Sequence, residues 1–170
     1  SIRTLNLDEV NKLGEGVKAI ALPDERWDKV DIKTTNLIPN ILAQTKAEKK
    51  FAYTAMLFRD GICTEGATSN VFAVKDGILY THPADNHILK GITRQMIVTR
   101  VAPSLGITLI EKEFDRAFVD DADELFFTDT IGCVIPIIKL DKNPVSGGKP
   151  GHVTLRLREA LEKLMEEGLP

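Results

Sequence analysis

The stretch Asp31-Ile32-Lys33-Thr34-Thr35-Asn36-Leu37 places one lysine between apolar and hydroxyl residues, and the other motifs of the chain are interpreted around it. Val30 and Ile32, just before the lysine, favour extended backbone. Thr35 or Asn36 is suited to cap a helix, because a side-chain oxygen there accepts a hydrogen bond from the free amides of the first turn. The pattern predicts that Lys33 lies between the end of a strand and the start of a helix.

The predicted helix follows this stretch and ends in the charged run 46–50. Pro39 fits its first turn, where the missing N–H has no helical partner. A lysine at such a junction would lose solvent, which favours the neutral, nucleophilic amine. The alternative is an ordinary solvated lysine beside Asp31. We expect the helix to bury one face, because apolar and small residues recur at helical spacing at Leu37, Ile38, Ile41, Leu42 and Thr45.

Length and composition exclude several classes of protein. A chain of 170 residues suits one domain with a sizeable core, or a domain of something longer. Its 43% hydrophobic and 28% charged residues are typical of a soluble globular protein. The net charge of −3 argues against the positively charged surface that binds nucleic acid, so we predict no nucleic-acid partner. No apolar run approaches the ~20 residues of a membrane span, so we predict no membrane partner.

Cysteine and histidine spacing argues against a metal centre. Cys63 and Cys133 stand far apart, in neither a metal motif nor a disulfide framework. This usage, without a signal-peptide layout, favours a reducing, cytoplasmic setting. His82, His87 and His152 form no ligand pair at helical spacing, so we predict no metal site.

Hydrophobic runs and turn residues predict a mixed α+β order. Ser1–Glu15 is interpreted as a lead-in or interdomain linker, and residues 16–170 as one domain. Asp-Gly pairs at residues 60–61 and 76–77 predict two consecutive hairpins. Helices are predicted from Gly91 and from Val153. Strands are predicted over residues 17–22, 52–58, 62–65, 71–74, 78–82, 107–114, 124–128 and 134–140.

Glu65 and the segment from Gly91 to Thr93 are candidate binding residues. Glu65 lies at a strand edge and is either a surface charge or the acid that holds a protonated ring nitrogen. Gly91-Ile92-Thr93 is either an ordinary helix start or a phosphate cup, because helix N-terminal amides favour an anion. Thr130 offers a second hydroxyl of the same type. A ligand with an aldehyde, a ring nitrogen and a phosphate would match Lys33, Glu65 and the helix start.

In this order and spacing the residues resemble the pyridoxal-phosphate-dependent aminotransferases of fold type IV (class IV), with the D-amino-acid aminotransferases as the closest pattern. The resemblance covers roughly residues 16–165. Its motifs are Asp31-Ile32-Lys33-Thr34-Thr35-Asn36-Leu37, Thr64-Glu65-Gly66-Ala67-Thr68-Ser69-Asn70-Val71, Thr81-His82-Pro83, Ile88-Leu89-Lys90-Gly91-Ile92-Thr93-Arg94 and Phe127-Thr128-Asp129-Thr130.

The resemblance implies a role for each matching residue. Lys33 would form the Schiff base with pyridoxal 5'-phosphate and move a proton, and Glu65 would bind the pyridine nitrogen. Leu89 would pack against the ring. Ser69 and Asn70 would support Glu65, and the phosphate would be bound by Gly91, Ile92, Thr93 and Thr130. The implied fold is the strand-rich pseudo-barrel C-terminal domain of that family with flanking helices, acting as a homodimer.

The implied activity is transfer of an amino group between an amino acid and a 2-oxo acid, with D-amino acids preferred. Branched-chain L-amino-acid aminotransferase, aminodeoxychorismate lyase and an inactive fragment are the alternatives. The family's smaller N-terminal domain, which supplies a phosphate-binding arginine, has no counterpart here, so we expect weak cofactor retention and little turnover from this chain alone. Gly132-Cys133 also departs from the alanine-glutamate that relatives often carry.

Overall fold

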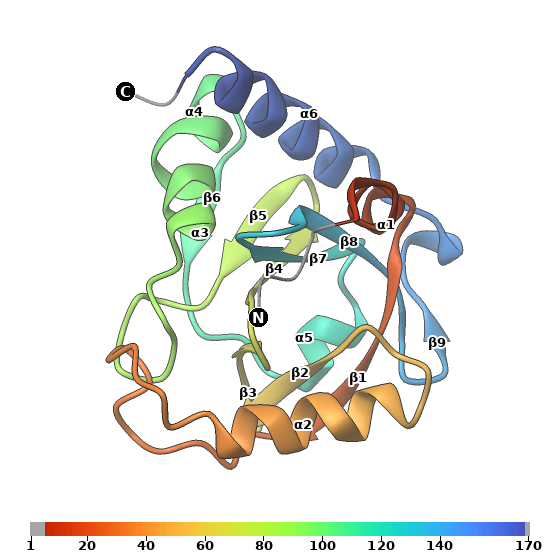
Figure 1. Cartoon of the computed structure of the whole chain (residues 1–170). Helices are drawn as coiled ribbons and strands as arrows, with labels where there is room; N and C mark the ends of the chain where they lie inside the picture. The colour runs from red at the N-terminus through yellow and green to blue at the C-terminus, as the bar shows by residue number, and fades with distance from the viewer. Residues whose placement is uncertain (1–5, 169–170) are drawn as a thin grey trace.

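A computed structural model describes residues 6–168 and shows a curved, mixed sheet with helices at two of its ends (Figure 1). In the described residues the sheet has nine strands in the order β3-β2-β1-β8-β7-β4-β5-β6, with β9 paired to β8. The strands are β1 (Val17–Pro23), β2 (Thr54–Arg59), β3 (Ile62–Gly66), β4 (Asn70–Lys75), β5 (Ile78–Thr81), β6 (Leu109–Glu111), β7 (Glu124–Asp129), β8 (Cys133–Leu140) and β9 (Asn143–Pro144).

The sheet contains both parallel and antiparallel strand pairs. Strand β1 runs parallel to β2 and β8, whereas β2–β3, β4–β5, β4–β7 and β7–β8 are antiparallel. The α-helices are α1 (Leu7–Lys12), α2 (Ile38–Glu48), α3 (Ile92–Met96), α4 (Ala102–Ser104), α5 (Arg116–Asp120) and α6 (His152–Glu166), and a π-helical turn, η2 (Ile97–Val101), joins α3 to α4. The predicted α+β class is confirmed. None of the helices in residues 6–168 has the length and apolar character needed to cross a membrane.

Both predicted hairpins form at the Asp-Gly pairs. Asp60 and Gly61 have φ values of 50° and 83°, and Asp76 and Gly77 have 52° and 74°. Positive φ at both central residues is the geometry of the two-residue turn that matches the twist of paired strands, and asparagine, aspartate and glycine tolerate it best. The first hairpin fixes the position of β3, which carries Glu65 at its end.

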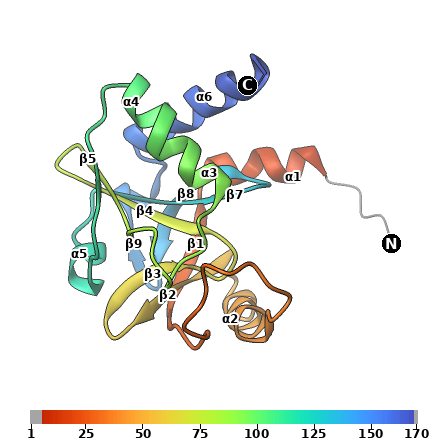
Figure 2. The same ribbon diagram turned by 90° about the vertical axis from the view of Figure 1, so that its left-hand side faces the viewer.

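Helices pack on the sheet at opposite ends of the molecule, as Figures 1 and 2 show. Helix α6 and the α3–η2–α4 helix cover one end, where Leu157 and Leu161 join a core cluster with the stacked rings of Phe72 and Phe126, 4.9 Å apart. Helix α2 covers the other end and buries Ala43 and Ala47 against the apolar residues of β1 and β2. The strands between these two ends carry the candidate site.

The start of α2 differs from the prediction. Strand β1 ends at Pro23, so Lys33 lies in a loop, residues 24–37, and the predicted strand end before it is wrong. The helix begins at Ile38 with no side-chain cap, so neither Thr35 nor Asn36 caps it. Instead, the Oγ1 atom of Thr34 accepts a hydrogen bond from the Asn36 amide at 3.2 Å, which holds the loop before the helix.

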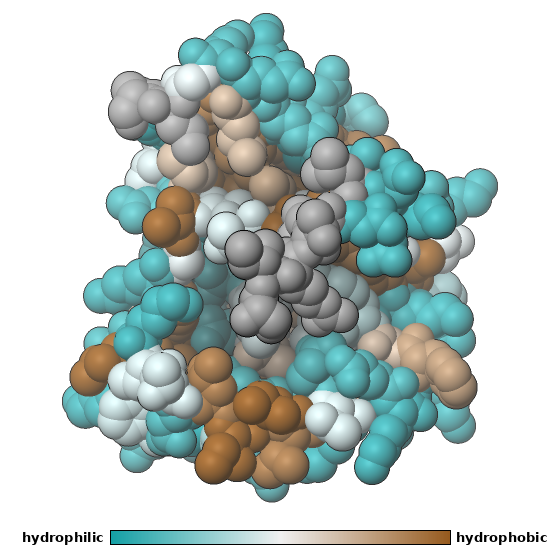
Figure 3. All heavy atoms as spheres, in the orientation of Figure 1, coloured by the Kyte–Doolittle hydropathy of each residue, from teal (hydrophilic) through white to brown (hydrophobic). Residues whose placement is uncertain are grey.

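The expected burial of the apolar face of α2 is wrong as well. The helix packs through alanines, which permit close approach to the sheet, so the larger residues face outward. They form a hydrophobic patch over α2 in Figure 3. Exposed fractions in this α2 patch are 47% for Leu37, 67% for Ile38, 59% for Ile41 and 52% for Leu42.

Three further segments depart from the prediction in smaller ways. The lead-in contains a helix, α1, capped by the side chain of Asn6. The strand predicted over residues 107–114 is limited to β6. The segment between this predicted strand and the one predicted over residues 124–128, for which no helix was predicted, contains α5, because the side chain of Asp115 accepts a hydrogen bond from the Phe118 amide at 2.8 Å.

Replacing Glu124 with alanine is expected to destabilise the fold. This buried carboxylate of β7 accepts hydrogen bonds from the Val153 amide (2.9 Å), the Thr154 amide (2.8 Å) and the Thr154 hydroxyl (2.7 Å), so it caps α6 from the sheet. Losing a charged acceptor at a buried helix start costs about 3 kcal/mol of unfolding free energy. Urea denaturation measures the loss, and Glu159→Ala, on the exposed side of α6, is the matched control.

Candidate active site

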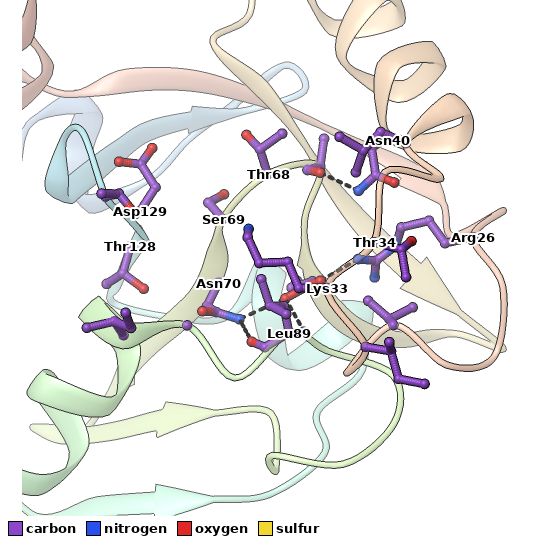
Figure 4. Close-up of a pocket in the computed structure, with 18 of the residues that line it drawn as sticks. Arg26, Lys33, Thr34, Asn40, Thr68, Ser69, Asn70, Leu89, Thr128 and Asp129 are labelled. Carbon is purple, nitrogen blue, oxygen red and sulfur yellow. Dashed lines mark hydrogen bonds and ion pairs between the residues drawn. The ribbon is translucent and has the colours of Figure 1, made fainter.

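A cavity of about 320 Å³ opens where the loop 24–37, the end of β3, the loop 82–91 and the turn after β7 meet (Figure 4). It brings together residues that are almost 100 positions apart in the sequence. The cavity is lined by every residue that the sequence singled out for cofactor binding, which are Lys33, Glu65, Ser69, Asn70, Leu89, Gly91, Ile92, Thr93 and Thr130.

The side chain of Lys33 extends into this cavity, with its amine toward Ser69 (Figure 4). Its loop is tied to the loop 82–91 by hydrogen bonds from the Val30 amide to the Asn86 carbonyl (2.9 Å), from the Asn86 side chain to the Asp28 carbonyl (2.8 Å) and from the Arg26 side chain to the His87 carbonyl (3.3 Å). Lys33 is nevertheless exposed, so the expected loss of solvent is wrong for this chain. The solvated alternative describes the lysine, although it lines a cavity.

Glu65 is a buried acid, with 4% of its surface exposed, so the alternative of a surface charge is wrong. Its Oε1 atom accepts a hydrogen bond from Arg26, and its Oε2 atom accepts from the Asn70 side chain (2.7 Å) and the Leu89 amide (3.0 Å). Burial raises the pKa of Glu65 to about 7, while the charge of Arg26 and these hydrogen bonds act in the opposite direction. The carboxyl group is therefore poised to change charge near neutral pH.

Asn70 and Ser69 differ in their relation to Glu65. The Asn70 side chain donates both to Glu65 and to the Leu89 carbonyl (2.8 Å), so it joins the acid to the loop 82–91. Ser69 is also buried, but its hydroxyl has no hydrogen-bond partner among the described residues and does not reach Glu65. The free hydroxyl lies at the cavity, where a ligand would be its partner.

The helix start at Gly91 lines the cavity, and the amides of a first helical turn have no partner within the helix. Gly91 is the N-cap residue of α3, and a Cβ atom there would lie 2.2 Å from the Oδ1 atom of Asn70. Only glycine therefore permits this close approach. The Thr93 hydroxyl donates to the Asp129 carbonyl at 2.8 Å, so it fixes the helix start against the end of β7. Thr130 is exposed in the turn beside it.

Arg26 and Thr128 are site residues that the sequence did not reveal. Arg26 lies in the loop after β1, is 7% exposed, and shares no spacing with Glu65 that would predict their contact. Thr128 is 2% exposed, and its hydroxyl lines the cavity without a partner among the described residues. A threonine at a strand end carries no signal of its own. Both residues become recognisable only once the sheet brings the loops together.

The turn after β7 departs from the family pattern and has its own geometry. The Oδ1 atom of Asp129 accepts hydrogen bonds from the amides of Ile131 (2.9 Å) and Gly132 (2.6 Å). Its Oδ2 atom accepts one from the Tyr53 hydroxyl at 3.2 Å. Burial and this carboxylate raise the pKa of Tyr53. Cys133 has a φ of 59°, so the departing pair marks a tight left-handed turn at the edge of the site.

Two of the histidines come closer together than the sequence predicted. Ligand atoms of His82, Asp85 and His87 lie within 4.8 Å of one another, because the Asp85 side chain accepts a hydrogen bond from the His87 amide and folds the loop. The Nδ1 atom of His82 already lies 2.9 Å from the Pro83 carbonyl. Helical spacing therefore could not reveal the approach of these side chains, because they lie in a loop.

The fold and the cavity together define a domain of the class IV aminotransferases. A family profile described as amino-transferase class IV matches residues 3–140, and the chain belongs to this family. Among solved structures, the branched-chain aminotransferase of Thermoproteus uzoniensis with norvaline has a TM-score of 0.83 and 31% identity, over 89% of this chain and 52% of that one. The predicted strand-rich C-terminal domain is thereby confirmed.

Among curated relatives, the D-alanine aminotransferase of Staphylococcus aureus (strain COL) is 42% identical over 154 residues, which are 91% of this chain and 54% of the relative. That of Bacillus licheniformis is 40% identical over 147 residues, or 86% of this chain and 52% of the relative. The chain spans about half the length of the curated relatives it matches.

The predicted cofactor is confirmed for the family. An aminotransferase of Brucella abortus bound to pyridoxal phosphate has a TM-score of 0.78 and 26% identity, over 89% of this chain and 55% of that one. The predicted family is confirmed as well.

Proposed function

We propose that this chain supplies the cofactor-binding lysine of an enzyme that transfers an amino group between an amino acid and a 2-oxo acid. The observation that carries the proposal is the cavity in which Lys33, the buried acid Glu65 and the helix start at Gly91 meet. These are an amine, an acid and an anion site, which match the aldehyde, the ring nitrogen and the phosphate of pyridoxal phosphate.

The residues of the cavity fit this cofactor. A volume of about 320 Å³ lies within the range of small-molecule sites. The hydroxyls of Ser69 and Thr128 are buried polar groups without a protein partner among the described residues, and a ligand in the cavity can supply one. Gly91, Ile92, Thr93 and Thr130 would hold the phosphate, and Leu89 would lie against the ring. When bound, the cofactor supplies an electron-accepting ring for charge that develops at the amino acid's α-carbon.

The remaining roles in the reaction are assigned to side chains and amides of the protein. Lys33 would offer the amine that bonds to the cofactor and, once the substrate's amino group has displaced it, the freed amine would carry the proton to or from the substrate. Glu65 would hold the ring nitrogen in its protonated form. Asn70 and the Leu89 amide orient Glu65 through the hydrogen bonds at its Oε2 atom.

D-Amino acids are the proposed substrates, because the sequence relatives are D-alanine aminotransferases. The solved branched-chain aminotransferases favour L-branched-chain amino acids as the second candidate. The test gives the protein D-alanine or L-valine with 2-oxoglutarate and measures the glutamate formed. Glutamate from D-alanine supports the proposal, and glutamate from L-valine alone supports the second candidate. Pyruvate released from aminodeoxychorismate without an acceptor would identify the lyase instead.

The α2 patch supports a homodimer as the functional unit. Three large apolar side chains of α2 and that of Leu37 just before it face outward, and patches of this kind mark protein interfaces. We expect the double variant Ile38→Asp/Ile41→Asp to sediment as a monomer under conditions in which the unchanged protein sediments as a dimer. Lys50→Glu changes charge just beyond the other end of α2 without removing apolar area, and it should leave the dimer intact. Equal sedimentation of all three proteins as monomers would contradict the homodimer.

The free cysteines Cys63 and Cys133 support a cytoplasmic location, since disulfides are rare in reducing compartments.

A further inference from the structure

Arg26 connects the acid of the cavity to a second buried acid. Its Nε and Nη2 atoms form a fork on Asp24, at 2.8 Å from Oδ1 and 2.7 Å from Oδ2, and its Nη1 atom donates to Oε1 of Glu65. The Asp24 side chain is fully buried and that of Arg26 is 3% exposed. A guanidinium with two carboxylates in fixed, planar geometry is the strongest kind of side-chain ion pair.

The charges continue outward from this pair in alternating sign. Arg59 lies 3.7 Å from Asp24 and 2.6 Å from Asp28, whose side chain is 86% exposed. The row of Glu65, Arg26, Asp24 and Arg59 therefore runs from the cavity wall to the surface. Removing one member of such a buried row leaves its neighbours uncompensated, which is costly.

The carboxylate of Glu65 has one acceptor position left. Two carboxylate oxygens offer about four lone-pair positions. Arg26 occupies one on Oε1, while Asn70 and the Leu89 amide occupy two on Oε2. The fourth position is available to a donor from the cavity that Glu65 lines. A protonated ring nitrogen is such a donor.

We propose that Arg26 is the positioning residue that stabilises the ionised form of Glu65 and holds its last acceptor position toward the cofactor ring. The proposal rests on the proposed function in naming the ring, whereas the control of Glu65 by Arg26 stands on the chain alone. Because a neutral Glu65 would offer its own proton to the ring nitrogen, it would no longer favour the protonated ring. Arg26 would then control the protonation state of the ring nitrogen without contacting the cofactor.

The charges around Glu65 agree with this assignment. Burial raises the pKa of Glu65 to about 7, and Arg26 is the first of the groups that lower it. Asp24 acts in the opposite direction, and its own charge is neutralised by Arg26. The loop 24–37 also contributes Lys33, and the loop 82–91 contributes the backbone carbonyl of His87, 3.3 Å from Arg26. Arg26 is therefore the cation in direct contact with the acid.

The test follows the ionisation of Glu65 in the protein without cofactor. Glutamate labelled with ¹³C at the carboxyl carbon is titrated by NMR, and the Glu65 signal is assigned by its loss in Glu65→Gln. We expect a midpoint of about 7 for the unchanged protein. In Arg26→Met the midpoint should rise by at least about one pH unit, because the neighbouring cation is lost. Arg26→Lys keeps the positive charge but loses the fork on Asp24, so its Glu65 midpoint should lie close to that of the unchanged protein.

Arg59→Met is the matched control, since Arg59 contacts Asp24 and the backbone carbonyl of Arg26 (2.7 Å) but forms neither an ion pair nor a hydrogen bond with Glu65. Its Glu65 midpoint should stay within about 0.3 pH units of the unchanged protein. If Arg26→Met does not fold, the double variant Arg26→Met/Asp24→Asn removes both charges of the buried pair and carries the same expectation. An unchanged midpoint in these variants, or an equal rise in Arg59→Met, would overturn the control of Glu65 by Arg26.

A second measurement addresses the cofactor. Pyridoxal phosphate is titrated into the same proteins and binding is followed by absorbance. We expect at least about tenfold weaker binding to Arg26→Met than to Arg59→Met. Equal binding by the two variants would overturn the link between Arg26 and the ring. If the unchanged protein binds no pyridoxal phosphate, the proposed function fails, while the NMR result still decides whether Arg26 controls Glu65.

Discussion

In a protein that also carries the family's N-terminal domain, replacing Lys33 with alanine is expected to reduce amino transfer by at least about 10³-fold, because one side chain supplies both the bonding amine and the proton carrier. Stability should hardly change. Lys33 is exposed and makes no side-chain hydrogen bond or ion pair within the described residues, and surface substitutions of this kind stay within about 0.5 kcal/mol. The measurements are the initial rate of glutamate formation and the urea midpoint of the same preparations.

Lys29→Ala is the control for this prediction, since Lys29 is an exposed lysine in the same loop. It should keep nearly full activity. Added methylamine should restore part of the activity of Lys33→Ala, because a small amine replaces the missing proton carrier. Full activity of Lys33→Ala would contradict the role of this residue, and equal loss in Lys29→Ala would point to the loop instead.

Replacing Glu65 with glutamine is expected to reduce amino transfer by about 100-fold, because the substitution keeps the shape but removes the charge at the ring nitrogen. Arg26 retains Asp24 as a partner, so the variant should fold. The measurement is kcat with a saturating amino acid. Glu25→Gln, at an exposed glutamate of the loop that carries Arg26, is the control and should match the unchanged protein.

The same substitution should change the dependence of stability on pH. Burial raises the pKa of Glu65 from 4.5 to about 7, so between these values the folded protein holds a proton that the unfolded chain releases. The unfolding free energy therefore falls as the pH rises from about 4.5 to about 7. Glutamine does not titrate, so Glu65→Gln should lose this slope. A slope that persists would show that another group causes it.

Asp24 titrates in a different window and does not obscure this result. Burial acts to raise its pKa, but the hydrogen bonds and the charge of Arg26 hold the pKa of Asp24 below the ordinary value of 3.8. Its contribution to stability is therefore present above that pH and is lost only as the pH falls further. A urea series from pH 4.5 to pH 8 separates the two acids.

The sequence predicted those parts of the fold that local chemistry controls. The Asp-Gly pairs at residues 60–61 and 76–77 determined both hairpins, because few other residues tolerate positive φ at both turn positions. The order of Lys33, Glu65 and Gly91 also predicted that an amine, an acid and a helix start belong to one site. All three line the same cavity.

Features that depend on what packs against a segment were not predictable. Leu37 and Ile41 have the spacing of a buried helix face, yet α2 packs through Ala43 and Ala47. Helical periodicity shows that a face is apolar but not what covers it. For the same reason the desolvation expected at Lys33 did not follow from its neighbours in the sequence.

Contacts between distant loops were also not predictable from the sequence. Arg26 and Glu65 are 39 positions apart, and an arginine after a strand is more often exposed than buried. Their contact exists because β1 and β2 pair in parallel, which brings the loop after β1 beside the hairpin that carries Glu65. No local sequence pattern predicts the parallel pairing of β1 with β2.

The most direct measurement of the central claim is chemical trapping of the bond between Lys33 and the cofactor. The protein is incubated with pyridoxal phosphate, reduced with sodium borohydride, digested and analysed by peptide mass spectrometry. We predict one phosphopyridoxyl group, located on Lys33 and absent from Lys33→Ala. A group on a different lysine, or no group on a protein that binds the cofactor, would contradict the account.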